Sequence, residues 1–129
     1  MTTNSDIIDW DEAMEQCGDD EEFLRELLAD LRGETDSQVA KIEETIRNPP
    51  TEAPFHKIMR ASHVIKGAAS NLMCGQLRTA AMNLEQAASA ANDLDPSQGK
   101  EVMSIVQARY VELKLAVEKF HAFLTSISV

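Results

Sequence analysis

Hydrophobic residues along the chain recur every three or four positions, the spacing of helices that bury one side. The period-2 alternation typical of half-buried strands is absent, and the 129 residues include only 5 glycines and 4 prolines. Four long stretches keep the helical spacing, and a short one precedes them. The pattern predicts an all-α protein, an up-down antiparallel four-helix bundle with a short additional N-terminal helix.

Glycine, proline and acidic residues mark the ends of these helices. Residues 1–5 are polar and are expected to form a flexible N-terminus, after which Asp6 or Asp9 caps a short helix that Gly18 ends. Residues 6–129 are expected to form one bundle domain. The four long helices are expected at residues 20–48, 51–73, 75–91 and 102–127.

The charge of the chain is negative and unevenly distributed. Twelve Lys and Arg against 22 Asp and Glu give a net charge of −10. Residues 1–54 hold 4 basic and 16 acidic residues, whereas residues 55–129 hold 8 basic and 6 acidic ones. This balance argues against binding to nucleic acid or to an anionic membrane surface, and it places the positive charge in the second half of the chain.

The cysteines and the lengths of the apolar runs indicate the compartment. No run approaches the roughly 20 apolar residues that span a bilayer, and no signal peptide is visible. Cys17 and Cys74 form neither a disulfide framework nor a zinc site and are most simply small hydrophobic residues, although Cys74 lies at a turn where a thiol can be exposed and oxidised. We therefore expect a cytoplasmic protein without a bound metal.

The third long helix carries the candidate chemistry. Its core-facing seam has spacings of 3, 4, 3, 4 and 3, in the order Phe55, Ile58, Ser62, Ile65, Ala69 and Leu72. His63 lies one residue off this seam, about 100° around the helix, and is expected to point to solvent.

Residues one or two turns from His63 make its surroundings small and positively charged. The residues on this face are His56, Arg60, Lys66, Gly67 and Ser70. A glycine inside an exposed helix costs about 1 kcal/mol relative to alanine, so Gly67 indicates a place where another molecule approaches the backbone. The basic residues favour a phosphoryl group or an acidic partner surface.

A neutral imidazole is a competent acceptor of a phosphoryl group near neutral pH. Phosphoryl transfer also requires a metal ion and carboxylates that neutralise the transferred group, and the sequence shows no such cluster beside His63. A docked partner must then supply them. These observations predict a phosphoryl carrier without self-sufficient kinase activity.

The segment from Ser62 to Leu72, SHVIKGAASNL, resembles the signature of histidine-containing phosphotransfer (HPt) domains, which reads H-x-x-K-G, small residues and a leucine. The similarity extends to residues 77–85 and to residues 9–31 and so covers most of the chain. The resemblance implies that His63 is phosphorylated, that Lys66 neutralises the phosphoryl group and that Gly67 leaves space for the partner.

The resemblance also implies a place in two-component signalling. His63 would receive its phosphoryl group from a receiver-domain aspartate, of a response regulator or a hybrid sensor histidine kinase, and pass it to another receiver in a phosphorelay. The receiver would supply Mg²⁺, and this chain would bind no cofactor. Arg60, Ser70 and His56 are candidates for docking the partner, against the alternatives of a solvated face for Arg60, a small spacer for Ser70 and a neutral role for His56.

One position departs from the family pattern, and two other functions remain open. The family has a glycine after the leucine, where this chain has Met73, so an extended turn to Gly75 is expected. The first alternative is an interaction module of the same fold that regulates a receiver or kinase by binding alone. The second is a metal- or cofactor-binding four-helix bundle, but this sequence lacks the Glu and Glu-x-x-His pairs that are expected of di-iron sites in such bundles. Four core helices in one chain favour a monomer.

Overall fold

The computed structural model describes residues 7–48, 53–93 and 99–129, and all regular secondary structure in these ranges is helical. The helices are α2 (Trp10–Gln16), α3 (Glu21–Arg47), α4 (Pro54–Asn71), α5 (Gly75–Asn92) and α6 (Gly99–Ser126). The expected flexible segment 1–5, Asp6 and the two prolines after α3 lie outside the described residues. The predicted all-α class is confirmed.

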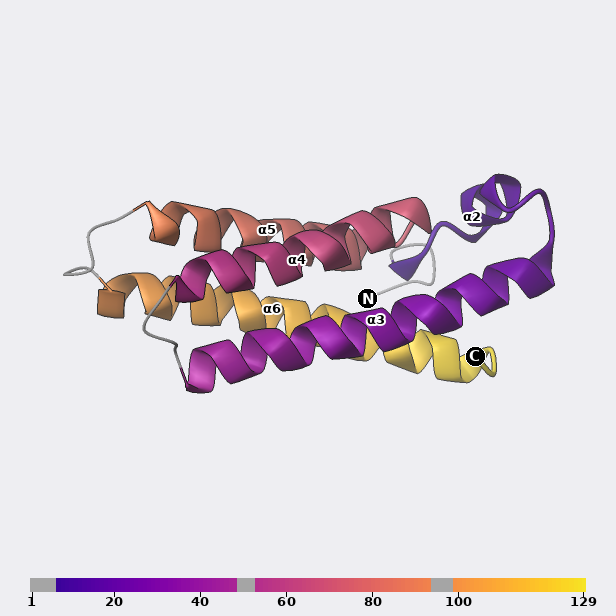
Figure 1. The fold of residues 1–129 in the computed structure, drawn as a ribbon. Coiled ribbons are helices and arrows are strands. Elements are labelled where there is room, and N and C mark those ends of the chain that lie inside the picture. Colours follow the sequence, from indigo (N-terminus) through magenta and orange to yellow (C-terminus); the bar gives the residue numbers. More distant parts are fainter. Residues whose placement is uncertain (1–6, 49–52, 94–98) are drawn as a thin grey trace.

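The four long helices run alternately up and down, and α2 lies at one end of the bundle (Figure 1). Helix α4 packs between α3 and α5, while α6 packs against α5 and, more sparsely, against α3. Helix α6 therefore lies diagonally across the bundle from α4. This is the predicted four-helix bundle with a short additional helix.

Local sequence signals explain where the helices begin. The side chain of Asp9 accepts a hydrogen bond from the backbone N–H of Glu12 at 3.2 Å, and Asp20 accepts one from Phe23 at 3.1 Å. Each carboxylate satisfies a backbone donor that has no partner within its helix. Pro54 starts α4, where the missing N–H of proline costs nothing.

The turn between α4 and α5 consists of the three residues from Leu72 to Cys74. Met73 takes a left-handed backbone conformation with φ of 60°, and the N–H of Cys74 donates to the carbonyl of Ala69 at 2.9 Å. The turn thus extends to Gly75, where α5 begins, as expected, whereas the expected helix end at residue 73 is wrong because α4 ends at Asn71. Met73 occupies the left-handed position after a helix that glycine fills most readily, which accounts for the glycine in the family pattern.

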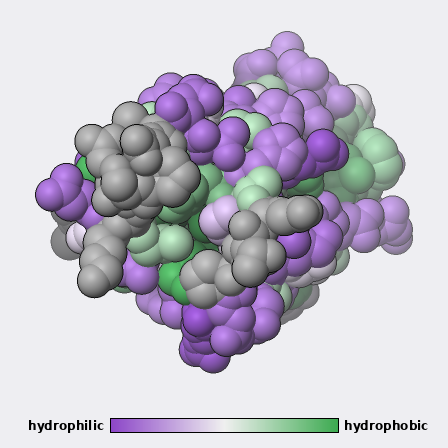
Figure 2. Space-filling model, turned by 60° about the vertical axis from the view of Figure 1, so that its left-hand side comes forward, coloured by the Kyte–Doolittle hydropathy of each residue, from purple (hydrophilic) through white to green (hydrophobic). Residues whose placement is uncertain are grey.

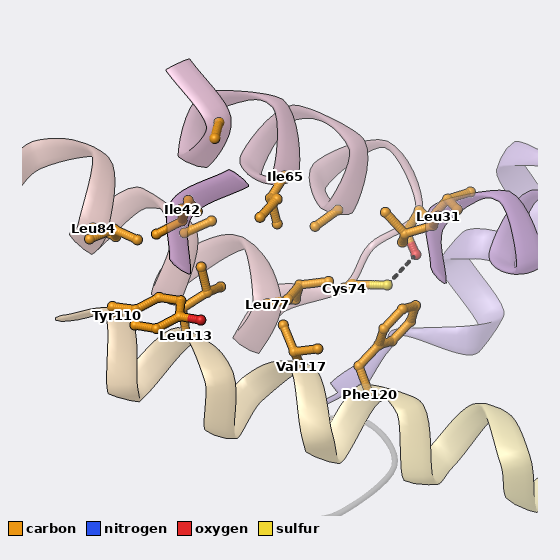
Figure 3. Close-up of a cluster of buried hydrophobic side chains, with 14 of the residues drawn as sticks. Leu31, Ile42, Ile65, Cys74, Leu77, Leu84, Tyr110, Leu113, Val117 and Phe120 are labelled. Carbon is orange, nitrogen blue, oxygen red and sulfur yellow. Dashed lines mark hydrogen bonds between the residues drawn. The ribbon is translucent and has the colours of Figure 1, made fainter. Parts of the chain in front are cut away.

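A single hydrophobic core joins the helices. Figure 3 shows the middle of it, where side chains of α3, α4, α5 and α6 converge. Ile42, Ile65, Leu84 and Leu113 are fully buried within it. The surface in Figure 2 is mostly hydrophilic, with smaller hydrophobic areas between. None of the helices in the described ranges combines the length and apolar character needed to cross a bilayer.

Cys74 belongs to this core and is not exposed. Its side chain is fully buried, and its Sγ lies 3.6 Å from the carbonyl oxygen of Leu72 (Figure 3). Burial raises the pKa of the Cys74 thiol to about 12, because a thiolate would lose its hydration. The interpretation of Cys74 as a small hydrophobic residue is confirmed, and the alternative of an exposed, oxidisable thiol is wrong, since the turn folds the side chain inward.

Candidate functional site

His63 projects from the outer side of α4, with 66% of its side chain exposed. Its neighbours Ser62 and Ile65 are buried, and the Ser62 hydroxyl donates to the carbonyl of Ile58 at 2.7 Å. The serine hydroxyl is thus satisfied within the helix, and the seam predicted from the spacing is the buried side of α4. His63 lies off that seam and faces solvent, as predicted.

A carboxylate of the next helix holds the imidazole from one side. His63 Nδ1 lies 2.6 Å from Glu85 Oε2, and the same carboxylate accepts a hydrogen bond from Lys66 Nζ through Oε1, also at 2.6 Å. Only 17% of the Glu85 side chain and 29% of the Lys66 side chain are exposed. Glu85 of α5 therefore ties together two side chains that lie one turn apart on α4.

The electrostatics of this cluster favour an ionised carboxylate. Burial raises the pKa of Glu85, but hydrogen bonds from Lys66 and His63 and their charges lower it, and the net pKa lies below its usual 4.5. An ionised carboxylate has no proton to donate, so the proton in its bond to His63 resides on Nδ1. In the neutral imidazole, the lone pair is then on Nε2, the other ring nitrogen.

The other predicted site residues surround His63 without joining this hydrogen-bonded cluster. Gly67, Ser70 and Arg60 are exposed on α4, and His56 is half-buried near its start. Neither His56 nor Ser70 forms a hydrogen bond with His63, Lys66 or Glu85. Lys66 is thus linked to the imidazole by the carboxylate of Glu85, to which both side chains bond. Gly67 and Ser70 have no side chain or a short one, so no bulky group stands on the adjacent surface.

Gly67 has no packing role within the described chain. A Cβ built at this position meets no atom within 4 Å, and the same holds for Gly33 in α3. Nothing inside the bundle therefore requires glycine at position 67. Its position one turn from His63 fits a requirement that comes from outside the molecule.

An open groove of about 750 Å³ lies between α3 and α4, beside His63. Lys41, Lys57 and Arg60 contribute positive charge to its lining, and Val64 contributes apolar surface with 39% of the residue exposed. Glu44 is the acidic residue of this lining. The groove therefore offers a mainly basic, partly apolar surface on the side of His63 away from α5.

Glu85 is the site residue that the sequence pattern did not single out. It is separated from His63 by 22 positions and lies on a different helix, so helical periodicity could not pair them. One signal was available, because Glu85 is the sole acidic residue of α5, whose residues are otherwise small, apolar or amide-bearing apart from Arg78. An isolated carboxylate in such a helix suggests a specific partner.

The described part of the chain contains no group of three His, Cys, Asp or Glu side chains arranged to hold a metal ion. The carboxylate that bonds to the imidazole is that of Glu85, and its other oxygen accepts a hydrogen bond from Lys66. This cluster can orient an imidazole and present one of its nitrogens.

Comparison with known families identifies the family of the chain. The family model described as Hpt domain matches residues 26–122, about three quarters of the chain, and the chain belongs to the Hpt domain family. The family implies phosphotransfer in two-component phosphorelays and interaction with receiver domains and kinases. No curated protein and no solved structure matches the chain.

Proposed function

We propose that His63 accepts a phosphoryl group from the aspartate of one receiver domain and transfers it to the aspartate of another. The observation that supports this most directly is the bond between Glu85 and His63 Nδ1, which leaves Nε2 as the free nitrogen of an exposed side chain. His63 is the phosphoacceptor in this proposal, and Nε2 is the atom that reacts.

The lone pair of Nε2 attacks the phosphorus of the aspartyl phosphate. The bond between phosphorus and the aspartate oxygen breaks, the aspartate leaves as a carboxylate, and a phosphorus–nitrogen bond forms. Nδ1 keeps its proton throughout, and the positive charge that develops on the ring is stabilised by Glu85 at 2.6 Å. Transfer to the second receiver reverses these steps.

Lys66 would neutralise part of the charge of the phosphoryl group. Its ammonium carries three N–H donors, and the structure commits it to Glu85 at 2.6 Å. With 29% of its side chain exposed, it retains access to solvent one turn from His63. It can thus bond to Glu85 and to a phosphoryl oxygen together.

The receiver would dock over α4, across the groove beside His63. Lys57 and Arg60 would face acidic groups of the receiver, and Val64 would contact an apolar side chain. Gly67 and Ser70 would lie under the approaching loops, and His56 would border the contact two turns before His63. Gly67 matters most because a side chain there would stand between the two proteins.

The metal ion of the reaction would come from the receiver, which brings Mg²⁺ and its own carboxylates. This chain would contribute an oriented nucleophile, one ammonium group and a docking surface, without kinase activity of its own. The proposal places the chain in the cytoplasm, together with the receivers of a response regulator and a hybrid sensor kinase.

The test is incubation of the purified protein with a phosphorylated receiver and Mg²⁺, followed by measurement of the transferred label. We expect label on the wild type that is lost in acid and retained in base, as is typical of a phosphorus–nitrogen bond. His63→Gln should abolish it. Glu85→Gln should slow labelling about tenfold or more, because the ionised partner of Nδ1 is lost.

His121→Gln is the matched control, since His121 of α6 lies outside the site and pairs with Asp36 at 3.1 Å. This variant should be labelled like the wild type. If several phosphorylated receivers bind the protein but none labels it, His63 is not a carrier. A regulator that acts by binding alone would then explain the fold.

A further inference from the structure

Glu85 contacts the nitrogen of His63 that takes no part in the proposed transfer. Its Oε2 lies 2.6 Å from Nδ1, and a second bond, from Lys66 to Oε1, holds the carboxylate in place. The phosphoryl group would be added at Nε2, the other ring nitrogen, so the contact with Glu85 does not have to break. The carboxylate therefore acts on the phosphorylated ring as well as on the free one.

The protonation of a phosphorylated imidazole decides how easily its phosphorus–nitrogen bond breaks. With a proton on Nδ1, the electron pair of the bond returns to Nε2 and a neutral imidazole leaves. Without that proton, the leaving group is an imidazolide anion, which is a far stronger base and a poorer leaving group. This difference is the reason that such a bond is lost in acid and retained in base.

An ionised carboxylate at Nδ1 favours the protonated ring. Its oxygen accepts a hydrogen bond from the N–H, whereas a deprotonated Nδ1 would direct a lone pair at a negative oxygen 2.6 Å away. Burial raises the pKa of Glu85, but the hydrogen bonds and charges of Lys66 and His63 bring it below 4.5, so the carboxylate is ionised at neutral pH. With 17% of the Glu85 side chain exposed, water screens this interaction incompletely.

Other charged and titratable side chains approach His63 from two helices. They are His56, Lys57, Arg60 and Lys66 of α4, and Lys41 and Glu44 of α3. Within the described ranges, the hydrogen bond and ion pair of the imidazole are both with Glu85. The α3 residues contribute charges of opposite sign, and all six residues remain when Glu85 alone is replaced. A comparison of the wild type with Glu85→Gln therefore isolates the carboxylate.

We propose that Glu85 keeps a proton on Nδ1 of phosphorylated His63 and thereby makes the phosphoryl group short-lived and readily transferred. The inference rests on the proposed function, in which Nε2 carries that group. In hydrolysis, water attacks phosphorus, the phosphorus–nitrogen bond breaks with its electron pair on Nε2, and the released dihydrogen phosphate carries both protons of the water. In transfer, a receiver aspartate takes the place of water. Nδ1 keeps its proton in both reactions.

The lifetime of the phosphoryl group can be measured without a receiver. Phosphoramidate, a small phosphoryl donor, is incubated with the purified protein and then removed, and the mass of the intact protein is followed between pH 5 and pH 9. His63→Gln, treated in the same way, gives the label on other residues, which is subtracted. The resulting decay rates describe phosphorylated His63 alone.

The wild type and Glu85→Gln should differ in their pH profiles. At pH 8, we expect the wild type to lose its phosphoryl group about tenfold faster than Glu85→Gln, because a displacement of ring protonation by one pH unit corresponds to a factor of ten. At pH 5, where the ring is protonated in both proteins, the two rates should agree. Circular dichroism checks that the variant is folded.

Two references accompany this comparison. Glu112→Gln is the matched control, because Glu112 of α6 pairs with Arg109 at 2.6 Å, outside the site, and this variant should decay like the wild type at every pH. A short peptide with one phosphorylated histidine and no acidic residue is a reference that requires no variant. At pH 8, the wild-type protein should lose its phosphoryl group faster than this peptide.

Two results would overturn the proposal. The first is an equal lifetime of the wild type and Glu85→Gln at pH 8. The second is a difference of the same size at pH 5 and pH 8, because a merely structural role of Glu85 acts at every pH.

Chemical phosphorylation keeps this test separate from that of the proposed function. If receivers fail to label His63, the proposed function fails, whereas the effect of Glu85 on a phosphorylated ring is still measured. If receivers label His63 and the two pH profiles coincide, the proposed function stands and this inference fails. A wild type that phosphoramidate does not phosphorylate at His63 would contradict the free Nε2 on which both depend.

Discussion

At the scale of single residues, the site depends on one carboxylate that serves two partners. Glu85 accepts from Lys66 with one oxygen and from His63 with the other. In the first bond, the positive charge of Lys66 balances the negative charge of the ionised carboxylate. The second bond fixes which nitrogen of the imidazole carries the proton. A Glu85 without Lys66 would leave a largely buried charge with a single partner, so the lysine supports the geometry as well as the proposed charge neutralisation.

The lowered pKa of Glu85 predicts how stability depends on pH. Because folding favours the ionised form, Glu85 stabilises the protein above pH 4.5, and this contribution is lost as the pH falls through its lowered pKa. Glu85→Gln should therefore reduce the free energy of unfolding by on the order of 1 kcal/mol at neutral pH. Urea denaturation of both proteins between pH 7 and pH 3 should show the difference closing at acid pH. A difference that stays constant would mean that the charge of Glu85 has no role.

At the scale of the helix, α4 serves two surfaces with one sequence. Its inner side, with Ile58, Ile65 and Ala69, is fully buried, and its outer side presents His63 between the groove of α3 and the carboxylate of α5. The outer side is kept low by small residues, among which Gly67 is the least favourable for a helix. In the proposed function, Gly67 lowers the stability of the helix and gives a partner access to the surface beside His63.

This opposition can be measured by comparing two glycines. Gly67→Ala and Gly33→Ala should each raise the free energy of unfolding by up to about 1 kcal/mol, because both glycines lie inside helices and their added Cβ meets open space. Of the two variants, only Gly67→Ala should slow phosphotransfer from a receiver, since Gly67 lies one turn from His63 and Gly33 lies on another helix, α3. Equal transfer rates in the two variants would contradict a role for Gly67 at the contact.

At the scale of the whole molecule, the helices share one core. The buried cluster takes residues from the segment before α2 through the end of α6, including Ile8 and Leu124. The C-terminal end is also held against α3, because Arg25 and Arg32 of that helix donate to the carbonyl oxygens of Ile127 and Val129. A core of this kind predicts that the bundle unfolds as one unit.

Trp10 provides a local probe for this prediction. Its ring packs edge-on against Phe123 of α6, with 6.4 Å between the ring centres. Tryptophan fluorescence, which reports on α2, and circular dichroism, which reports on all helices, should therefore follow the same urea transition. If fluorescence changes at a lower urea concentration, α2 unfolds separately from the four long helices.

The sequence predicted the helices and the exposure of His63, because both depend on local physics. Asp20 caps a helix through its own neighbours, Pro54 starts one through its fixed backbone angle, and His63 lies off the buried seam because a helix turns by about 100° per residue. The signature around His63 pointed to the family, which the match over residues 26–122 confirms. These features required no knowledge of how the helices pack.

The tertiary structure decided what lies beside each of these residues. The pairing of Glu85 with His63, the groove between α3 and α4 and the burial of Cys74 all depend on how neighbouring helices are rotated and joined. The turn through Met73 shows the same dependence on packing, since a residue other than glycine holds a left-handed conformation once the surrounding helices fix it. Periodicity determines which side of a helix is buried, whereas packing between helices determines which residue meets which.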